Sequence, residues 1–263
     1  MTNRLPSELK LPPAYRLVAY ETLPSTMDEA RNLALCGAEE GTIIWAKAQS
    51  AGRGRHGRTW QSNLGNLYLS IILRPACRLI FAAEIGFVAS LALKTALEKF
   101  LPPEVSLILK WPNDLLGDNR KVAGIILEAL SSSEIVDGLI LGVGVNVTHY
   151  PPDDDVRFPA TSLVQLSSGA KSDVLSVLEA FATCLHTYLY RWRSEGFSKI
   201  LEAWQATTYP LGTPISIGLS ATRIKGKYKG LGPRGELLLE LPDGHQQSVN
   251  AGDVYFHISA QEK

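Results

Sequence analysis

The chain is poor in cysteine and carries no excess of charge of either sign. Its 263 residues include three cysteines that lie far apart, without a CxxC pair. An odd number of scattered cysteines argues against a disulfide framework or a zinc site, so we expect buried free thiols and no metal site built from side chains. Lys and Arg number 26, and Asp and Glu also number 26. Because general nucleic-acid and membrane-surface binders show a basic excess, we expect neither nucleic acid nor a membrane as a partner.

The sequence also lacks the signatures of membrane, secreted and common nucleotide-binding proteins. We find no run that approaches the ~18 apolar residues of a membrane span, and no apolar signal core at the N-terminus. There is no GxxxxGKS or GxxxxGKT phosphate loop, no HExxH motif and no GxSxG motif. These absences favour a cytoplasmic protein with a different chemistry.

Apolar spacing predicts an α+β fold with a mixed β-sheet flanked by helices. The predicted helices cover residues 25–36, 81–100, 174–197 and 200–206, and the predicted strands cover residues 42–48, 66–73, 106–111, 121–129 and 135–147. From about residue 213 the chain consists of short β-like runs broken by glycines, which predicts a small C-terminal SH3-like β-barrel of five strands. We therefore place a domain boundary between residues 1–212 and 213–263.

The most informative stretch is the run GRGRHGR at residues 52–58, with Trp60 close behind. Glycines let a backbone bend tightly and approach a ligand, and arginines present forked donors that match phosphate and carboxylate oxygens. The run directly follows the predicted strand 42–48, and a loop at the end of a strand is a usual place for a ligand site. A solvated basic loop or an RNA contact explains the run equally well by itself. Trp60 either covers a ligand or simply packs.

A second group of candidate residues surrounds a predicted hairpin turn at residues 117–120. Lys110 begins the stretch KWPND, and Lys121 begins KVAGI on the other side of the turn. A lysine at the start of an apolar strand is unfavourable unless it meets an anion or lies at an edge. Lys121 could also be a solvated hairpin lysine, and Asp114 could be a turn former. The run GVGVN at residues 142–146 has glycines of the kind that mark close approach by a ligand or by another backbone.

These stretches, in this order, resemble the biotin protein ligase family. The matching stretches are Ser25-Thr26, residues 49–58 (QSAGRGRHGR), 66–70 (NLYLS), 110–114 (KWPND), 121–125 (KVAGI), 144–146 (GVN) and 235–239 (GELLL). The resemblance covers roughly residues 20–258. GRGRHGR together with KWPND and KVAGI is highly specific, whereas either part alone is only suggestive.

The resemblance implies a class II synthetase-like catalytic domain and the activity of a biotin–acetyl-CoA-carboxylase ligase. In that family, the carboxylate of biotin attacks the α-phosphate of ATP with Mg²⁺, giving biotinyl-5'-AMP and pyrophosphate. A lysine of a biotin carboxyl carrier domain of acetyl-CoA carboxylase then attacks the mixed anhydride and releases AMP. Cationic donors must offset the repulsion between two anions, and a closing loop must keep water from the adenylate. The resemblance fits a monomer or a homodimer.

Candidate site residues follow from the resemblance by motif. Those expected on biotin are Ser25, Thr26, Met27, Gln49, Arg53, Gly54, Arg55, Lys121 and Gly124. Those expected on ATP or the adenylate are Arg58, Trp60, Lys110, Asn113, Asp114 and Asn146. The expected catalytic residues are Lys121, Arg55 and Asp114.

Two features depart from the family's common pattern. Met27 stands where the family commonly has asparagine, so the polar side-chain contact that the resemblance implies there is in doubt, whereas a backbone contact would survive. About 20 residues precede Ser25, too few for the helix-turn-helix domain of some members, so we expect a ligase without DNA binding. The competing hypotheses are a lipoate ligase or acyltransferase of the same fold, and a non-catalytic nucleotide or RNA binder.

Overall fold

The computed structural model describes residues 8–130, 134–156, 158–170, 172–219, 222–250 and 252–256. The helices are α1 (Thr26–Leu35), α2 (Leu79–Ala82), α3 (Glu84–Leu97), α4 (Leu163–Leu166), α5 (Val174–Glu195) and α6 (Phe197–Gln205). The strands are β1 (Arg16–Leu23), β2 (Thr42–Gln49), β3 (Leu67–Leu73), β4 (Leu107–Lys110), β5 (Asp114–Gly117), β6 (Arg120–Leu130), β7 (Gly138–Val145), β8 (Pro214–Leu219), β9 (Thr222–Leu231), β10 (Leu237–Glu240), β11 (Gln246–Val249) and β12 (Asp253–Phe256). The described residues also form the short 3-10 helices η2 (Arg55–Gly57), η3 (Glu98–Phe100) and η4 (Asp153–Asp155).

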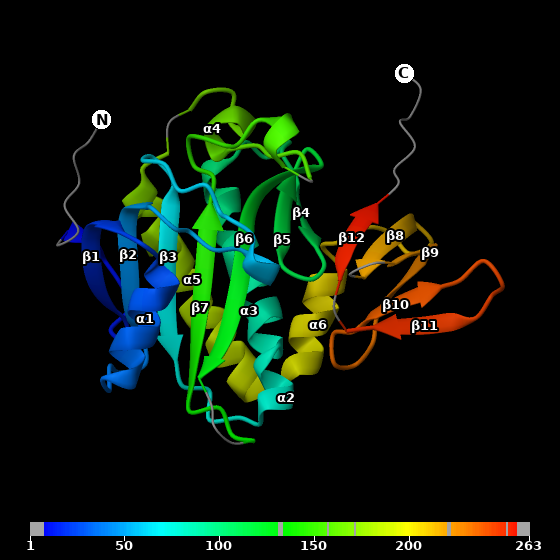
Figure 1. Cartoon of the computed structure of the whole chain (residues 1–263), viewed down its shortest axis with the longest axis horizontal. Helices are drawn as coiled ribbons and strands as arrows, with labels where there is room; N and C mark the ends of the chain where they lie inside the picture. The colour runs from blue at the N-terminus through cyan, green and yellow to red at the C-terminus, as the bar shows by residue number, and fades with distance from the viewer. Residues whose placement is uncertain are drawn as a thin grey trace.

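The larger part is a seven-stranded mixed sheet in the order β1-β2-β3-β7-β6-β5-β4. β1 and β2 run parallel, with α1 as their crossover, and the other neighbours are antiparallel. Alternate residues of a strand face opposite sides of a sheet. Accordingly, Ile44 of β2 and Ile72 of β3 pack with Met27 of α1, while Ile43 and Ile71 belong to the larger core on the other face. Figure 1 shows α1 on one face and α3, α5 and α6 on the other.

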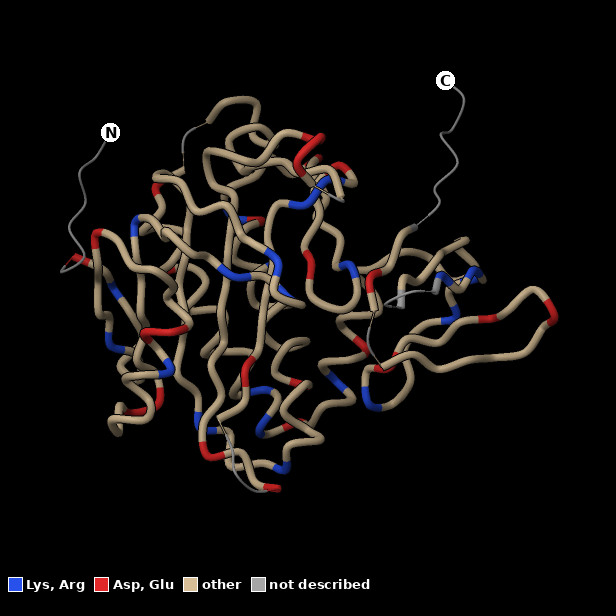
Figure 2. The backbone as a smooth tube through the Cα atoms, viewed as in Figure 1, with Lys and Arg blue, Asp and Glu red and all other residues tan. Residues whose placement is uncertain are grey.

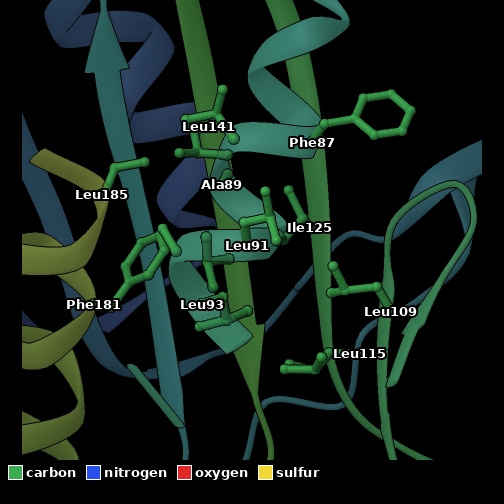
Figure 3. Close-up of a cluster of buried hydrophobic side chains, with 14 of the residues drawn as sticks. Phe87, Ala89, Leu91, Leu93, Leu109, Leu115, Ile125, Leu141, Phe181 and Leu185 are labelled. Atoms are coloured by element: carbon green, nitrogen blue, oxygen red, sulfur yellow. The ribbon is translucent and has the colours of Figure 1, made fainter. Parts of the chain in front are cut away.

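The larger core lies between the sheet and α3, α5 and α6. Leu91 and Leu93 of α3, Phe181 of α5, and Ile125 and Leu141 of the sheet are buried there (Figure 3). The stretch from α2 to η3 is long and apolar enough to cross a membrane by length and composition, so the prediction that no such run exists is wrong. In the most apolar part of that stretch, 56% is buried inside the fold. Its apolar side chains therefore serve to pack the protein core.

The C-terminal part is a five-stranded antiparallel sheet in the order β11-β10-β9-β8-β12, which confirms the predicted five-stranded barrel. It is attached firmly to the larger part. The indole Nε1 of Trp111 donates to the carbonyl of Gly235 over 2.9 Å, and the amide of Leu231 donates to Gln205 Oε1 over 2.9 Å. Gly235 has φ +81°, and an added Cβ there would lie 2.6 Å from Cε2 of Phe87, so glycine is needed on both counts.

The sequence predictions of α1, β2, β3, α3, β7, α5 and α6 agree with the structure to within a few residues. β1, β5 and α4 were missed. β1 is a half-exposed edge strand with a mixed pattern, and β5 has only four residues. Because β5 intervenes, the predicted pairing of residues 106–111 with 121–129 is wrong, and two consecutive hairpins take its place.

The turn of the second hairpin is confirmed, with Asp118 and Asn119 both at positive φ as a type I′ turn requires. The described cysteines are free thiols, but only Cys184 is buried. Cys36 is exposed and Cys77 is half-buried, so the expectation of buried thiols is wrong for both.

Candidate active site

A cavity of about 640 Å³ lies between the sheet, the barrel and residues 52–58, here called the Gly/Arg loop. The sequence-predicted residues that line it are Thr26, Met27, Gln49, Arg53, Gly54, Arg55, Arg58, Trp60, Lys110, Asn113, Asp114, Lys121, Gly124 and Asn146. They come from α1, β2, the loop after it, β4 to β6 and the end of β7 (Figure 1). Ser25 is the exception, because it does not line the cavity and is 1% exposed at the N-cap of α1. Its hydroxyl has no hydrogen-bond partner within the described part of the chain.

One end of the cavity is a fixed polar network. The backbone amide and hydroxyl of Thr26 both donate to Gln49 Oε1, over 2.8 Å and 3.1 Å. Gln49 Nε2 donates to Ser62 Oγ over 2.9 Å, and the hydroxyl of Ser70 donates to that of Thr26 over 2.9 Å. These bonds determine which way the Gln49 amide points and hold it still. A small polar ligand at this end would meet preorganised groups.

The floor of the cavity is formed by glycines of β6 and β7. A Cβ on Gly144 would lie 2.6 Å from Cε2 of Trp60, and one on Gly124 would lie 3.2 Å from Cζ3 of the same indole. Met27 approaches Gly142 in the same way. The close approach that the sequence predicted here therefore involves side chains, with the Trp60 indole packed against both strands. Its Nε1 is buried without a hydrogen-bond partner among the described residues, so the indole leaves one donor available.

The main charged group is a carboxylate between two lysines. Lys110 Nζ lies 3.2 Å from Asp114 Oδ2, and Lys121 Nζ lies 2.5 Å from Asp114 Oδ1. Burial by itself raises the pKa of Asp114, but attraction from Lys121 and then Lys110 outweighs it and lowers that pKa to about 2. The group thus holds one more positive than negative charge at neutral pH. Lys121 is not a solvated hairpin lysine, and Asp114 begins β5 instead of forming a turn.

A β-bulge puts these three residues together. Asp114 pairs with Gly124, but Leu116 pairs with Lys121, so β6 has one extra residue in between. Lys121 is three residues from Gly124, which stands opposite Asp114. In a regular strand, this odd spacing would point the Lys121 side chain to the other face of the sheet, away from Asp114. The bulge reverses the direction of Lys121 and brings its ammonium to the carboxylate.

The Gly/Arg loop is held by its three arginines, each of which contacts a different part of the fold. Arg53 reaches Asp28 of α1 over 2.5 Å, Arg55 donates to Asn113 Oδ1 over 3.2 Å, and Arg58 forms a bidentate pair with Asp253 of β12. Arg55 is the most enclosed of the three, and burial is the main cause that lowers its pKa. Its guanidinium is therefore the loop cation best placed to act inside the cavity.

Two asparagines of the site also donate hydrogen bonds to backbone carbonyls. Asn113 Nδ2 donates to the carbonyl of Ile125 over 2.6 Å, and Asn146 Nδ2 donates to the carbonyl of Thr161 over 3.0 Å. Sequence reasoning missed Phe158, which lies 4.7 Å from Lys110 Nζ, and Asp253 and Tyr255, which bring the barrel into the cavity wall. No local pattern marks these three residues, because they reach the site only through the tertiary fold.

The Arg58–Asp253 pair gives a direct test of how the barrel holds the loop. We expect Asp253→Asn to speed tryptic cleavage within residues 53–58 about fivefold, because a partly exposed ion pair contributes roughly 1 kcal/mol to local closure. The charge exchange Arg58→Asp with Asp253→Arg should restore slow cleavage at Arg53 and Arg55. Equal cleavage rates in the wild type and Asp253→Asn would show that the pair does not hold the loop.

The fold and the cavity define a ligase of the biotin and lipoate class. Residues 19–146 match the model of the biotin/lipoate A/B protein ligase family, and residues 211–257 match the biotin protein ligase C-terminal domain. The chain is 36% identical over 234 residues to a biotin–acetyl-CoA-carboxylase ligase of Paracoccus denitrificans, covering 88% of this chain and 97% of the relative. It therefore belongs to the biotin protein ligase family.

Two further comparisons agree. The bifunctional ligase/repressor BirA of Bacillus subtilis is 32% identical, over 89% of this chain and 72% of its own length. The structure of the biotin protein ligase from Aquifex aeolicus in complex with biotin and ATP has a TM-score of 0.78 and 28% identity, covering 93% of this chain and 99% of that one. The class II synthetase-like fold with a C-terminal SH3-like barrel is thereby confirmed.

Proposed function

We propose that this chain activates biotin with ATP and transfers the biotinyl group to a lysine of an acceptor protein. The observation that carries the proposal is the Lys110–Asp114–Lys121 group under Arg55, in a cavity whose other end is the Thr26–Gln49 network. This arrangement offers fixed polar groups for an uncharged ring and cations for a carboxylate beside a phosphate. Relatives bearing the name of this activity support it, as does the Aquifex aeolicus complex.

In the first step, a carboxylate oxygen of biotin bonds to the α-phosphorus of ATP, and the bond to pyrophosphate breaks. Lys121 and Arg55 would lie on the carboxylate and the α-phosphate oxygens, where charge builds up. Thr26, Met27, Gln49, Arg53, Gly54 and Gly124 would form the biotin side, with Ser25 buried behind them at the N-cap of α1. Arg58, Trp60, Lys110, Asn113 and Asn146 would form the nucleotide side.

In the second step, the neutral amine of the acceptor lysine attacks the acyl carbon, AMP leaves with the electrons of the C–O bond, and the proton that the nitrogen loses passes to solvent. With a pKa of about 2, Asp114 is a poor general base at neutral pH. Its role is to hold Lys110 and Lys121 in place, through one carboxylate oxygen each.

Magnesium would enter as part of the MgATP substrate. Among the described residues, no cluster of three His, Cys, Asp or Glu side chains could hold a metal ion. Mg²⁺ commonly keeps several waters and is held by substrate phosphates with one or two carboxylates. Asp155 of η4 lines the cavity and could supply such a carboxylate.

The acceptor we propose is the biotin carboxyl carrier domain of acetyl-CoA carboxylase, and the enzyme would act as a monomer or a homodimer. Free thiols in the described chain support a cytoplasmic location. We also propose that residues 1–212 form the catalytic domain and residues 213–263 a small barrel domain, since β8 begins at Pro214.

The test is biotin-dependent exchange between ATP and labelled pyrophosphate, followed by biotin labelling of the carrier domain. We expect both reactions with biotin and neither with lipoate. Exchange with lipoate but not biotin would favour a lipoate ligase. No exchange with either acid, together with RNA binding that weakens steeply with salt, would favour the non-catalytic alternative.

Arg55→Gly tests whether the loop retains the intermediate. Because Arg55 is the enclosed cation that joins the loop to Asn113, we expect its loss to release free biotinyl-5'-AMP at least about tenfold faster, roughly 1.4 kcal/mol of lost retention. Rapid filtration of enzyme loaded with labelled biotin measures this rate. Release as slow as that of the wild type would contradict a role for Arg55 in closing the cavity.

A further inference from the structure

One face of the barrel carries basic side chains that the cavity does not use. In β9, Arg223, Lys225, Lys227 and Lys229 are all exposed, whereas Tyr228 between them is buried in the core. Alternate residues of a strand point to the same face, so these four side chains form one continuous row, here called the basic row. Figure 2 marks basic positions of this part of the barrel in blue, at the right of the molecule.

The sheet register connects the basic row to the active-site cavity. Across β8, Arg223 stands in register with Asp253 of β12, and Lys225 stands in register with Tyr255. Residues paired across antiparallel strands share a face, and neighbouring strands lie ~4.8 Å apart, so the row begins about 10 Å from those two residues. Asp253 and Tyr255 both line the cavity. The Arg223 guanidinium also lies 4.8 Å from the centroid of the Tyr255 ring.

The row does little to stabilise the barrel itself. Glu240 pairs with Lys229 over 3.1 Å and stands in register with Lys227, but Lys225 and Lys227 form no ion pair with the described residues. Alternate residues on one strand are ~6.7 Å apart, so their like charges repel one another. The row carries four positive charges against the single negative charge of Glu240, and its placement beside the cavity favours a partner of opposite charge.

We propose that the basic row docks an acidic surface of the acceptor protein while the acceptor's lysine reaches the cavity. This inference rests on the proposed transfer of biotin to a protein. Biotin and ATP are small enough for the cavity, whereas a row about 20 Å long and outside it fits only a macromolecular substrate. The matching acceptor carries Asp and Glu side chains to one side of its target lysine, and the charges speed the encounter.

The experiment measures both half-reactions in Lys225→Glu/Lys227→Glu, with the carrier domain of acetyl-CoA carboxylase as acceptor. We expect KM for the carrier domain to rise at least about tenfold with kcat nearly unchanged. Biotin-dependent ATP–pyrophosphate exchange should equal that of the wild type, because neither lysine lines the cavity. Added salt should raise this KM in the wild type and much less in the variant. Lys99→Glu, a charge reversal at an exposed lysine of η3 outside the cavity, is the control and should leave KM for the carrier domain unchanged.

The outcomes separate this inference from the proposed function. Normal exchange with an unchanged KM for the carrier domain overturns the docking role alone, whereas a wild type without any exchange removes the proposed function itself. If the double variant binds a single-stranded RNA oligonucleotide more weakly but biotinylates the carrier domain normally, the row is an RNA contact and the inference is wrong. Lys225→Gln/Lys227→Gln repeats the measurement with a milder change should the charge reversal disturb folding.

Discussion

Lys121→Ala is expected to lower the rate of biotin-dependent ATP–pyrophosphate exchange by a factor of about 10² to 10³, or roughly 2.7–4 kcal/mol. The physical reason is the position of Lys121, whose ammonium lines the cavity at the carboxylate of Asp114. A cation there stabilises the charge that builds up when two anions react, and it does so more strongly at a partly buried position than in water. The measurement is exchange at saturating biotin and ATP.

The fold should survive this substitution. Lys121 is 24% exposed, and Lys110 still partners Asp114 after its loss, so the carboxylate keeps one cation. A melting temperature close to that of the wild type is therefore expected alongside the lost activity. Lys121→Arg keeps the charge and should recover part of the exchange rate, whereas Lys99→Ala should leave it unchanged. Wild-type exchange in Lys121→Ala would exclude the catalytic role.

Asp114→Asn is expected to lower the free energy of unfolding by about 3 kcal/mol at neutral pH. The substitution leaves two ammonium groups facing each other without a carboxylate, and Lys110 is only 5% exposed. Removing one partner from a buried charge group costs about 3–5 kcal/mol, and the partial exposure of Lys121 reduces the effect toward the lower limit. Urea unfolding measures it. Asp118→Asn, at an exposed turn position, is the control and should change little.

The difference in stability between the wild type and Asp114→Asn is also expected to depend on pH. The pKa of Asp114 is lowered from 3.8 to about 2 in the folded chain, so its contribution to stability is fully present above pH 3.8. That contribution is lost as the pH falls toward 2, because the carboxylate becomes protonated. The stability difference between wild type and Asp114→Asn should therefore shrink between pH 4 and pH 2. A constant difference over this interval would contradict the lowered pKa.

The helices and most central strands were predictable because their periodicity is local. α5 shows apolar residues at helical spacing over 22 residues, and β3 is apolar at every position except Ser70. The missed elements have weak local signals. β1 is an edge strand, and its mixed pattern of apolar and polar residues reflects partial exposure. β5 is stabilised by pairing with β4 on one side and β6 on the other.

By itself, the sequence determined the chemistry available to the site. Residues 52–58 alternate glycine with basic residues, and Lys110 and Lys121 begin the stretches KWPND and KVAGI. These local patterns indicate anion binding in any fold that brings the three stretches together. The resemblance they carry together was enough to predict the family.

Only the tertiary structure decided how these groups are arranged. The bulge in β6 points Lys121 at Asp114, and simple strand alternation would have pointed it away. The contact of Arg58 with Asp253 joins residues 195 positions apart, and it brings the barrel into the cavity wall. Such contacts depend on register and packing over the whole chain, which no short window of sequence contains.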